Sequence, residues 1–384
     1  MDFLQEFFTN VFGNLGNFDW RQPVMWVIGG ILIYLAIKKD MEPTLLLPMG
    51  FGAILLNLPM SGALEPIHVL YNAGIANDLF PLLLFVGIGA MIDFTPLLSN
   101  PKLMLFGAAA QFGIFFTFTM ATLIPMPVFE GGSFAGWDFF TLKDAASIAI
   151  IGAADGPTSI KVANALGTQY AGAIAVAAYS YMALVPVIIP PVVKLVTTKK
   201  ERQIRMAYST TQVTKSTKIL FPIAVTIVAG CIAPEAASLV GFLMVGNLIR
   251  ECGVLESLSE TAQKVLANLI TLFLGITIAF QMQADKFVTV PTLVIICLGL
   301  VAFIFDIIGG VMFAKLINLF AKNKVNPMIG AAGISAFPMA SRVVHKMGLE
   351  EDPQNFLLMH AAGANVAGQI SSAIAGGLIL SFML

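Results

Sequence analysis

Residues 152–161 read GAADGPTSIK and interrupt an otherwise apolar part of the chain. The run places an acid, Asp155, directly before a Gly-Pro pair and two hydroxyl residues. A carboxylate in lipid is costly, and a Gly-Pro pair breaks backbone hydrogen bonds that lipid cannot replace. We therefore expect this run to line a protected polar cavity in which Asp155 is a functional residue.

The composition is that of a polytopic membrane protein. Of the 384 residues, 58% are hydrophobic and 11% are charged, whereas an average soluble domain has roughly 25% charged residues. The net charge of -1 excludes a strongly basic nucleic-acid binder. The three cysteines and three histidines match no zinc or disulfide spacing, and the chain has no Walker motif for a nucleotide. The sequence therefore predicts none of these sites.

Apolar stretches of about 20 residues predict ten transmembrane spans. Five lie on each side of a polar, basic loop at 197–218, which we expect to be a cytoplasmic linker. Residues 1–20 are expected to form an amphipathic interfacial helix. The spans are placed near 22–38, 43–60, 80–98, 101–125, 168–196, 219–233, 234–250, 265–282, 289–320 and 354–383.

Two further segments, 143–167 and 324–348, contain too many glycines and prolines to cross the bilayer alone. They are predicted to be re-entrant hairpins. With the basic loop in the cytoplasm and alternating spans, only Arg21, Lys143 and Lys286 face out, while Lys161 and Arg342 lie within the hairpins. The positive-inside rule then predicts that both termini lie outside.

An internal repeat relates the two hairpins. Five positions of the first hairpin match the second at one constant offset, with Lys161 and Arg342 as a conservative pair. Each half has an odd number of spans, so the copies are inverted. The predicted fold is an all-α membrane protein of two inverted repeats, 21–196 and 219–384, with five transmembrane helices and one re-entrant hairpin each. This is the layout of an alternating-access transporter.

Asp155 has two interpretations. Its carboxylate can cap the half-helix that follows, or it can bind a hard cation together with freed carbonyls and Thr158 or Ser159. We favour the ion site, because a cap at membrane depth could be Ser or Asn at a lower desolvation cost. Aspartate can also exchange a proton for Na+, and such an exchange is a usable coupling step.

Two tyrosines follow in an Ala-rich span, Tyr179 and Tyr181. They face different sides of the helix. One is expected to be a packing aromatic, and the other to point into the site as a hydroxyl ligand or proton donor. Tyr181 aligns in the repeat with Asn365, so both copies place a polar group at this position.

The second hairpin has no counterpart of Asp155. Asn326 and Ser335 offer oxygens that suit a weakly held monovalent cation. Arg342 can pair with Asp155, hold an anionic carboxylate, or extend toward the interface as a snorkelling cation. Asp306, in the middle of a span, is a candidate second acid that binds a proton or ion, or that pairs with a cation on a neighbouring helix.

Several long motifs resemble one family. The run Ala154-Asp155-Gly156-Pro157-Thr158 is followed, in order, by Asn326-Pro327, Gly333-Ile334-Ser335-Ala336, Pro338-Met339-Ala340-Ser341-Arg342, Asp352-Pro353-Gln354-Asn355-Phe356-Leu357-Leu358-Met359-His360 and Asn365-Val366-Ala367-Gly368. Over nearly the whole chain, this order resembles the beta subunit of sodium-pumping biotin-dependent decarboxylases, of the methylmalonyl-CoA, glutaconyl-CoA or oxaloacetate type.

The resemblance implies that the chain decarboxylates carboxybiotin, consumes a proton and exports Na+. Biotin must arrive on a partner, because the chain has no biotinylation motif. The resemblance further implies an elevator-like motion and assembly with a small membrane-anchored subunit, a carboxyltransferase subunit and a biotin carrier subunit, around a homo-oligomeric core in the cytoplasmic membrane of a prokaryote. It places functional residues at Asp155, Tyr181, Asn326, Gly330, Ser335 and Arg342.

From these two lines of argument we assign roles. Asp155, Tyr181 and Arg342 are predicted to be catalytic, and Na+ is predicted to bind at Asp155, Asn326, Gly330, Ser335 and Asn365. The main alternative is a secondary Na+-coupled carboxylate transporter without chemistry, which would use the same inverted repeats. A proton-coupled exchanger would instead be indifferent to Na+. The decarboxylated acid is chosen by the carboxyltransferase, and the compact chain favours an acyl-CoA over oxaloacetate.

Overall fold

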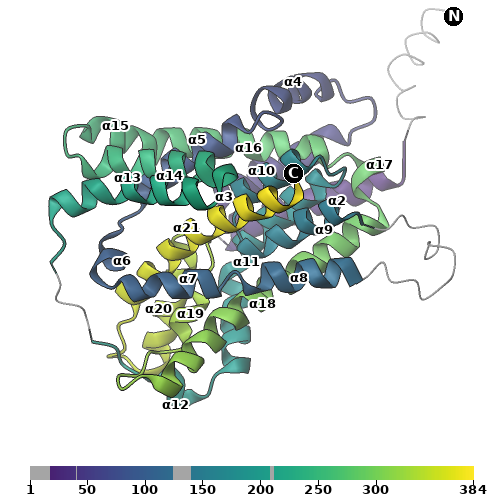
Figure 1. The fold of residues 1–384 in the computed structure, drawn as a ribbon. Helices are drawn as coiled ribbons and strands as arrows, with labels where there is room; N and C mark the ends of the chain where they lie inside the picture. Colours follow the sequence, from purple (N-terminus) through teal and green to yellow (C-terminus); the bar gives the residue numbers. More distant parts are fainter. Residues whose placement is uncertain (1–17, 40, 124–139, 208–211) are drawn as a thin grey trace, which may run out of the picture. The chain divides into compact units, whose positions relative to one another are not determined.

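The computed structural model describes residues 18–39, 41–123, 140–207 and 212–384. Within these ranges all regular secondary structure is helical (Figure 1). Most of the interfacial helix predicted at 1–20, and the last two residues of the span predicted at 101–125, lie outside the described residues. The expectation of an all-helical protein is therefore met wherever the chain is described.

Seven helices in the described part of the chain are long and apolar enough to cross a membrane. The number rises to eight if the bent pair α4 (Leu64–Gly74) and α5 (Leu79–Met91) counts as one span. Ten spans were predicted, and the difference arises where apolar sequence forms short helices. The predicted span at 43–60, for example, contains α3 (Pro43–Leu56), which has 14 residues. The helix count and composition are those of a multi-pass membrane protein.

The chain divides into two compact units, and each draws on both halves of the sequence. The first comprises residues 1–80 and 268–293, and the second comprises 81–267 and 294–384. The first unit contains α2 (Arg21–Lys39), α3, α4, most of α16 (Ala267–Ile278) and α17 (Ala284–Phe287). Within it, Asn57 joins distant parts of the chain, because its Nδ2 donates to Met282 O at 2.8 Å and its Oδ1 accepts from Ala284 N at 2.7 Å.

The second unit holds every predicted site residue. Helix α18 (Val290–Phe320) belongs to both units, because residues 290–293 are part of the first and residues 294–320 are part of the second. The other helices of this unit are most of α5, α6 (Thr95–Ser99), α7 (Met104–Ala109), α8 (Phe112–Leu123), α9 (Leu142–Ala149), α10 (Gly156–Leu166), α11 (Ala171–Val196), α12 (Lys199–Arg202), α13 (Lys215–Ile232), α14 (Ala237–Glu251), α15 (Glu256–Glu260), α19 (Met328–Ala331), α20 (Met339–Glu351) and α21 (Leu358–Met383).

The segment predicted as the first hairpin consists of α9, a short 3-10 turn (Ile150–Ala153) and α10. Ala154 lies between the turn and α10 with φ 52°, a left-handed conformation that costs a non-glycine residue roughly 1–2 kcal/mol. Asp155 is the N-cap of α10, Pro157 lies in its first turn, and Gly167 ends the helix with φ 67°. Local sequence thus determines where this segment breaks and where its second helix begins and ends.

The segment predicted as the second hairpin is also interrupted. The short helix α19 is followed by irregular backbone, and α20 begins at Met339. The two interruptions touch, because Ser335 N donates to Ala153 O at 3.3 Å. Two broken helical segments from opposite halves of the sequence therefore meet inside the second unit.

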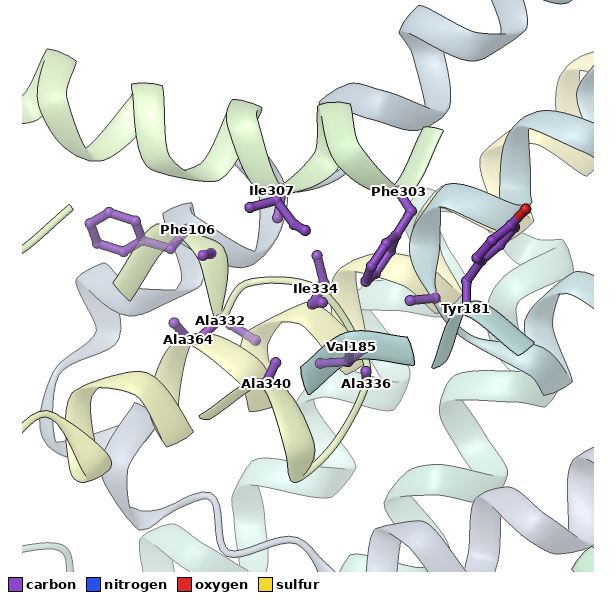
Figure 2. Close-up of a cluster of buried hydrophobic side chains, with 14 of the residues drawn as sticks. Phe106, Tyr181, Val185, Phe303, Ile307, Ala332, Ile334, Ala336, Ala340 and Ala364 are labelled. Carbon is purple, nitrogen blue, oxygen red and sulfur yellow. The ribbon is translucent and has the colours of Figure 1, made fainter. Parts of the chain in front are cut away.

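A hydrophobic cluster surrounds the second interruption (Figure 2). Ile334 and Ala336 from the interruption lie among Phe303 of α18 and Val185 of α11, and all four are buried. Helix α21 packs against α7, α10 and α20 (Figure 1). The second unit thus places irregular backbone in the interior of a tightly packed helical body, which is where such backbone is tolerated in a membrane protein.

Candidate functional site

The carboxylate of Asp155 is the centre of the site. Its side chain is 3% exposed. Oδ2 accepts hydrogen bonds from Thr158 Oγ1 at 2.7 Å and from Ser372 Oγ at 2.8 Å, and Oδ1 accepts from Thr158 N at 3.4 Å. The predicted capping contact is therefore present, and a hydroxyl from α21 is added to it.

The second interruption and α21 converge on the same place. Ser335 donates from both its backbone N–H and its hydroxyl to Ala153 O, two residues before Asp155. Asn365 of α21 donates from Nδ2 to Ile334 O at 2.6 Å. The structure therefore brings together Asp155, Ser335 and Asn365, three of the five residues predicted to bind sodium.

This arrangement suits an alkali cation better than a transition metal. Asn365 is fully buried, and its Oδ1 has no hydrogen-bond donor among the described residues. The hydrogen bond from Nδ2 to Ile334 O assigns the orientation of this amide. If Nδ2 and Oδ1 changed places, two oxygens that only accept hydrogen bonds would face each other. The described residues contain no group of three His, Cys, Asp or Glu side chains that could hold a metal ion. One carboxylate among neutral oxygens can exchange a hard monovalent cation or a proton.

The two tyrosines have separate positions. The Tyr181 hydroxyl donates to the Ile296 carbonyl of α18, and in Figure 2 it points away from the cluster around Ile334. Tyr179 is 1% exposed, and its hydroxyl has no partner among the described residues. A Cβ added at Gly156 would lie 2.3 Å from the Tyr179 ring, so Tyr179 packs directly on the residue after Asp155.

Asn326 is held by the linker that follows α11. Its Nδ2 donates to Arg202 O at 2.8 Å and to Ile204 O at 2.9 Å, and its Oδ1 accepts from Met328 N at 3.0 Å. Every one of these contacts is to backbone. In this conformation Asn326 joins the linker to the start of α19, and the structure does not bring it into contact with Asp155.

Gly330 has a packing role in this conformation. A Cβ at Gly330 would lie 2.0 Å from Gly310 O, and one at Gly310 would lie 2.1 Å from Gly330 O. Real Cβ atoms do not approach a backbone oxygen so closely. The absence of both side chains therefore lets α19 and α18 touch through their backbones.

Arg342 is exposed, near the start of α20 and past the second interruption. Within the described ranges it forms no ion pair, so the pairing with Asp155 considered from sequence is not present here. An exposed guanidinium beside a broken helix remains available to an anion from outside the chain.

Asp306 is fully buried in α18. Its Oδ1 accepts from Ile114 N at 3.2 Å, so the carboxylate caps the start of α8 from a neighbouring helix. No cation pairs with it among the described residues. Its Oδ2 has no donor there and faces Gly152, where an added Cβ would lie 2.7 Å away.

The cytoplasmic linker predicted at 197–218 makes ion pairs with the end of α20. Arg202 pairs with Glu351 at 2.6 Å, and Arg205 pairs with Asp352 at 2.6 Å. The hydrogen bond from Arg205 lowers the pKa of Asp352 below its usual value, helped by the backbone N–H of Gln354. The linker is thus fastened to the end of the second broken segment.

Sequence reasoning missed two residues at the site, Ser372 and Tyr179. Ser372 follows Asn365 by seven residues, which on an α-helix is two turns and nearly the same face. That spacing could have pointed to it once Asn365 was chosen. The choice between Tyr179 and Tyr181 had no such signal, because both are next to Ser180 and the rest of their surroundings in the sequence are apolar.

These features define a helical membrane protein that holds a carboxylate where two interrupted helices meet, the arrangement of an ion-translocating protein. Comparison with known sequences identifies the family within this class of membrane proteins. The family model described as "Na+-transporting oxaloacetate decarboxylase beta subunit" matches residues 21–383. The chain therefore belongs to this family, and it is the membrane subunit of a decarboxylase sodium pump.

Three relatives show how far the similarity extends. The glutaconyl-CoA decarboxylase subunit beta of Acidaminococcus fermentans is 49% identical over 368 residues, 95% of this chain and 94% of that protein. The methylmalonyl-CoA decarboxylase subunit beta of Veillonella parvula is 48% identical over 366 residues, again 95% and 94%. The oxaloacetate decarboxylase beta chain 2 of Salmonella typhi is 44% identical in an alignment that covers 94% of this chain and 95% of that protein. The resemblance inferred from the motifs is thereby confirmed.

Proposed function

We propose that this chain decarboxylates carboxybiotin and uses the free energy released to export Na+. The C–N bond of carboxybiotin breaks, CO2 leaves, and the biotin nitrogen takes up a proton. The observation that carries the proposal is the buried Asp155 carboxylate at the junction of the two interruptions. Exporting one Na+ against about 100 mV costs roughly 2.3 kcal/mol before any concentration gradient, so the two processes must be tightly coupled.

The proposed ion site consists of Asp155 with Ser335 and Asn365, whose contacts supply a carboxylate and neutral oxygens within one buried region. Ser372 joins this set through its hydrogen bond to Asp155. Asn326 and Gly330 complete the predicted sodium-binding set, and their backbone contacts support a role in holding the second broken segment in place.

Two residues are proposed to act on carboxybiotin and the proton. Arg342 is exposed and can hold the carboxylate of carboxybiotin in a charge-assisted hydrogen bond. Tyr181 is proposed to deliver the proton, and its hydroxyl must then leave the Ile296 carbonyl during turnover. Asp306 is proposed as a second buried acid, because its Oδ2 has no donor among the described residues.

We further propose that the two broken segments belong to inverted repeats and that the core bearing them moves as in an elevator transporter. Both termini would then lie outside the cytoplasmic membrane of a prokaryote, and the basic linker would lie inside. The supporting observation is that α9–α10 and α19–α20 are both interrupted, at equivalent positions of the aligned motifs. A binding site between two such broken segments is a recurring feature of alternating-access transporters.

The proposed partners are a small membrane-anchored subunit, a carboxyltransferase subunit and a biotin carrier subunit, around a homo-oligomeric core. The name "subunit beta" of the relatives supports a multi-subunit complex. The proposed substrate of the complex is an acyl-CoA. Identities of 49% and 48% to the glutaconyl-CoA and methylmalonyl-CoA proteins, against 44% to the oxaloacetate protein, support this choice.

The alternative, a secondary Na+-coupled carboxylate transporter, is not favoured by the family. The test uses the complete complex in liposomes and measures carboxybiotin decay together with 22Na+ uptake. We expect Asp155→Asn to abolish Na+ uptake and Na+-dependent decay, and we expect Asp285→Asn, the same change at an exposed acid, to behave like wild type. Transport by Asp155→Asn at the wild-type rate would overturn the site. Counterflow of a labelled dicarboxylate without biotin would favour the transporter.

A further inference from the structure

Helix α21 carries a row of polar side chains on one face. Asn365, Gln369 and Ser372 follow at spacings of four and three residues, and side chains so spaced are neighbours on a helix surface. Their exposed fractions are 0%, 3% and 0%. The rest of the helix is largely apolar, so these three side chains form a buried polar row.

Both ends of the row are anchored at the interruptions of the two broken segments. Asn365 Nδ2 donates to Ile334 O at 2.6 Å in the second, and Ser372 Oγ donates to Asp155 Oδ2 at 2.8 Å in the first. Gln369 lies between these anchors. The row therefore connects the two interruptions directly, with Gln369 at its middle.

Two oxygens of the row lack a donor. Among the described residues, neither Gln369 Oε1 nor Asn365 Oδ1 accepts a hydrogen bond. Buried amide oxygens are usually satisfied, and an unpaired one calls for an explanation such as a bound water or ion. Two neighbouring exceptions lie on one helix face, and the third member of the row, Ser372, contacts the Asp155 carboxylate. We take this face as an oxygen-lined place for a positively charged occupant. Neutral amide oxygens with one carboxylate suit a hard monovalent cation.

We propose that Gln369 is a ligand of the transported cation, so that the ion site extends along α21 from Asp155 through Gln369 to Asn365. The inference rests on the proposed function, since Na+ is the transported cation that binds to this row. Gln369 contacts the ion itself through Oε1. A bound water that satisfies the same oxygens is the competing occupant, and it predicts no dependence of Na+ affinity on this side chain.

The test compares Gln369→Met, which keeps the side-chain length and removes the amide oxygen, with Gln263→Met. Gln263 donates to Ser259 Oγ at 2.9 Å, away from α21. The complete decarboxylase complex is titrated with NaCl against choline chloride at constant ionic strength. Two quantities are followed, the 22Na+ uptake into liposomes and the thermal unfolding midpoint of the beta subunit in detergent. The second gives an apparent Na+ dissociation constant without turnover.

We expect Gln369→Met to raise the apparent Na+ constant at least about tenfold in both measurements, while Gln263→Met stays at the wild-type value. If Gln369→Met does not fold, Gln369→Glu decides. An acid at a cation ligand makes the apparent Na+ constant fall as the pH rises and the acid ionises, and a constant that equals the wild-type value at every pH overturns the proposal. A wild-type constant in Gln369→Met also overturns it, while leaving the pump intact. If wild type itself shows neither Na+-dependent stabilisation nor Na+ uptake, the proposed function fails, and this ligand with it.

Discussion

Ser372 Oγ lies 2.8 Å from Asp155 Oδ2, and this hydrogen bond joins α21 to the first interrupted segment. The two residues are 217 positions apart in the sequence. The carboxylate at the centre of the site is thus oriented by a hydroxyl from the last helix of the chain, as well as by Thr158 of its own helix.

The first prediction concerns Ser372→Ala. The change removes a hydrogen bond to a buried carboxylate, an interaction worth about 1.5–3 kcal/mol when one group is charged. We expect the Na+ concentration for half-maximal decarboxylation to rise about tenfold, corresponding to about 1.4 kcal/mol. Ser381→Ala is the matched control, because Ser381 lies on the same helix and donates to Gly377 O instead. An unchanged Na+ dependence in Ser372→Ala would show that Thr158 alone positions the carboxylate.

The second prediction separates packing from ligation at Gly330. An alanine Cβ there would meet Gly310 O at 2.0 Å, so one backbone must move, and overpacking of this kind costs about 1–3 kcal/mol or more. We expect both Gly330→Ala and Gly310→Ala to lower the thermal unfolding midpoint. Gly62→Ala, at a position with nothing within 4 Å, should not lower it. A Gly330→Ala protein with the wild-type midpoint and weakened Na+ binding would instead indicate a role at the ion.

Local sequence signals predicted the first broken segment well. Asp155, Pro157 and Gly167 act on their own neighbourhoods, as an N-cap, a first-turn proline and a left-handed C-cap. Such signals need no knowledge of the rest of the fold. The break and both boundaries of α10 could therefore be anticipated from the residues alone.

The contacts that complete the site could not be predicted in this way. The spacing from Asn365 places Ser372 on the same helix face, but it does not tell that Ser372 meets Asp155, because that contact depends on how α21 packs. Tyr179 and Tyr181 lie in a helix that is apolar on all sides, so sequence does not tell which phenol faces the break. Asn326 is predicted to bind Na+ from its amide oxygen and its motif position, and sequence gives no sign of the contacts that it makes here to linker and helix backbone.

The third prediction is a pH dependence at the linker. The hydrogen bond from Arg205 lowers the pKa of Asp352 in the folded protein. A lowered pKa gives a contribution to stability that is complete above the unfolded value, about 3.9, and is lost as the pH falls through the lower folded value. We therefore expect the difference in unfolding midpoint between wild type and Asp352→Asn to be constant from about pH 5 to pH 9, and to shrink below about pH 4.

The control for this experiment is Asp285→Asn, at an exposed acid for which the described residues provide no ion pair. That variant should match wild type over the same range. A midpoint difference for Asp352→Asn that changes near neutral pH would mean that another group, not Asp352, controls the attachment of the linker.

The fourth prediction tests Asp306, whose Oδ1 caps α8 while its Oδ2 has no donor among the described residues. Asp306→Asn keeps an oxygen for the N–H of Ile114 but cannot exchange a proton or bind a cation by charge. We expect it to fold with nearly the wild-type unfolding midpoint and to lose Na+-dependent decarboxylation. Asp306→Leu also removes the cap and leaves the Ile114 N–H with only its bond to Gln111 O at 3.2 Å, so it should be destabilised by about 0.5–2 kcal/mol. Full activity in Asp306→Asn would limit Asp306 to capping α8, because an acid that carries a proton or an ion cannot be replaced by its amide without loss.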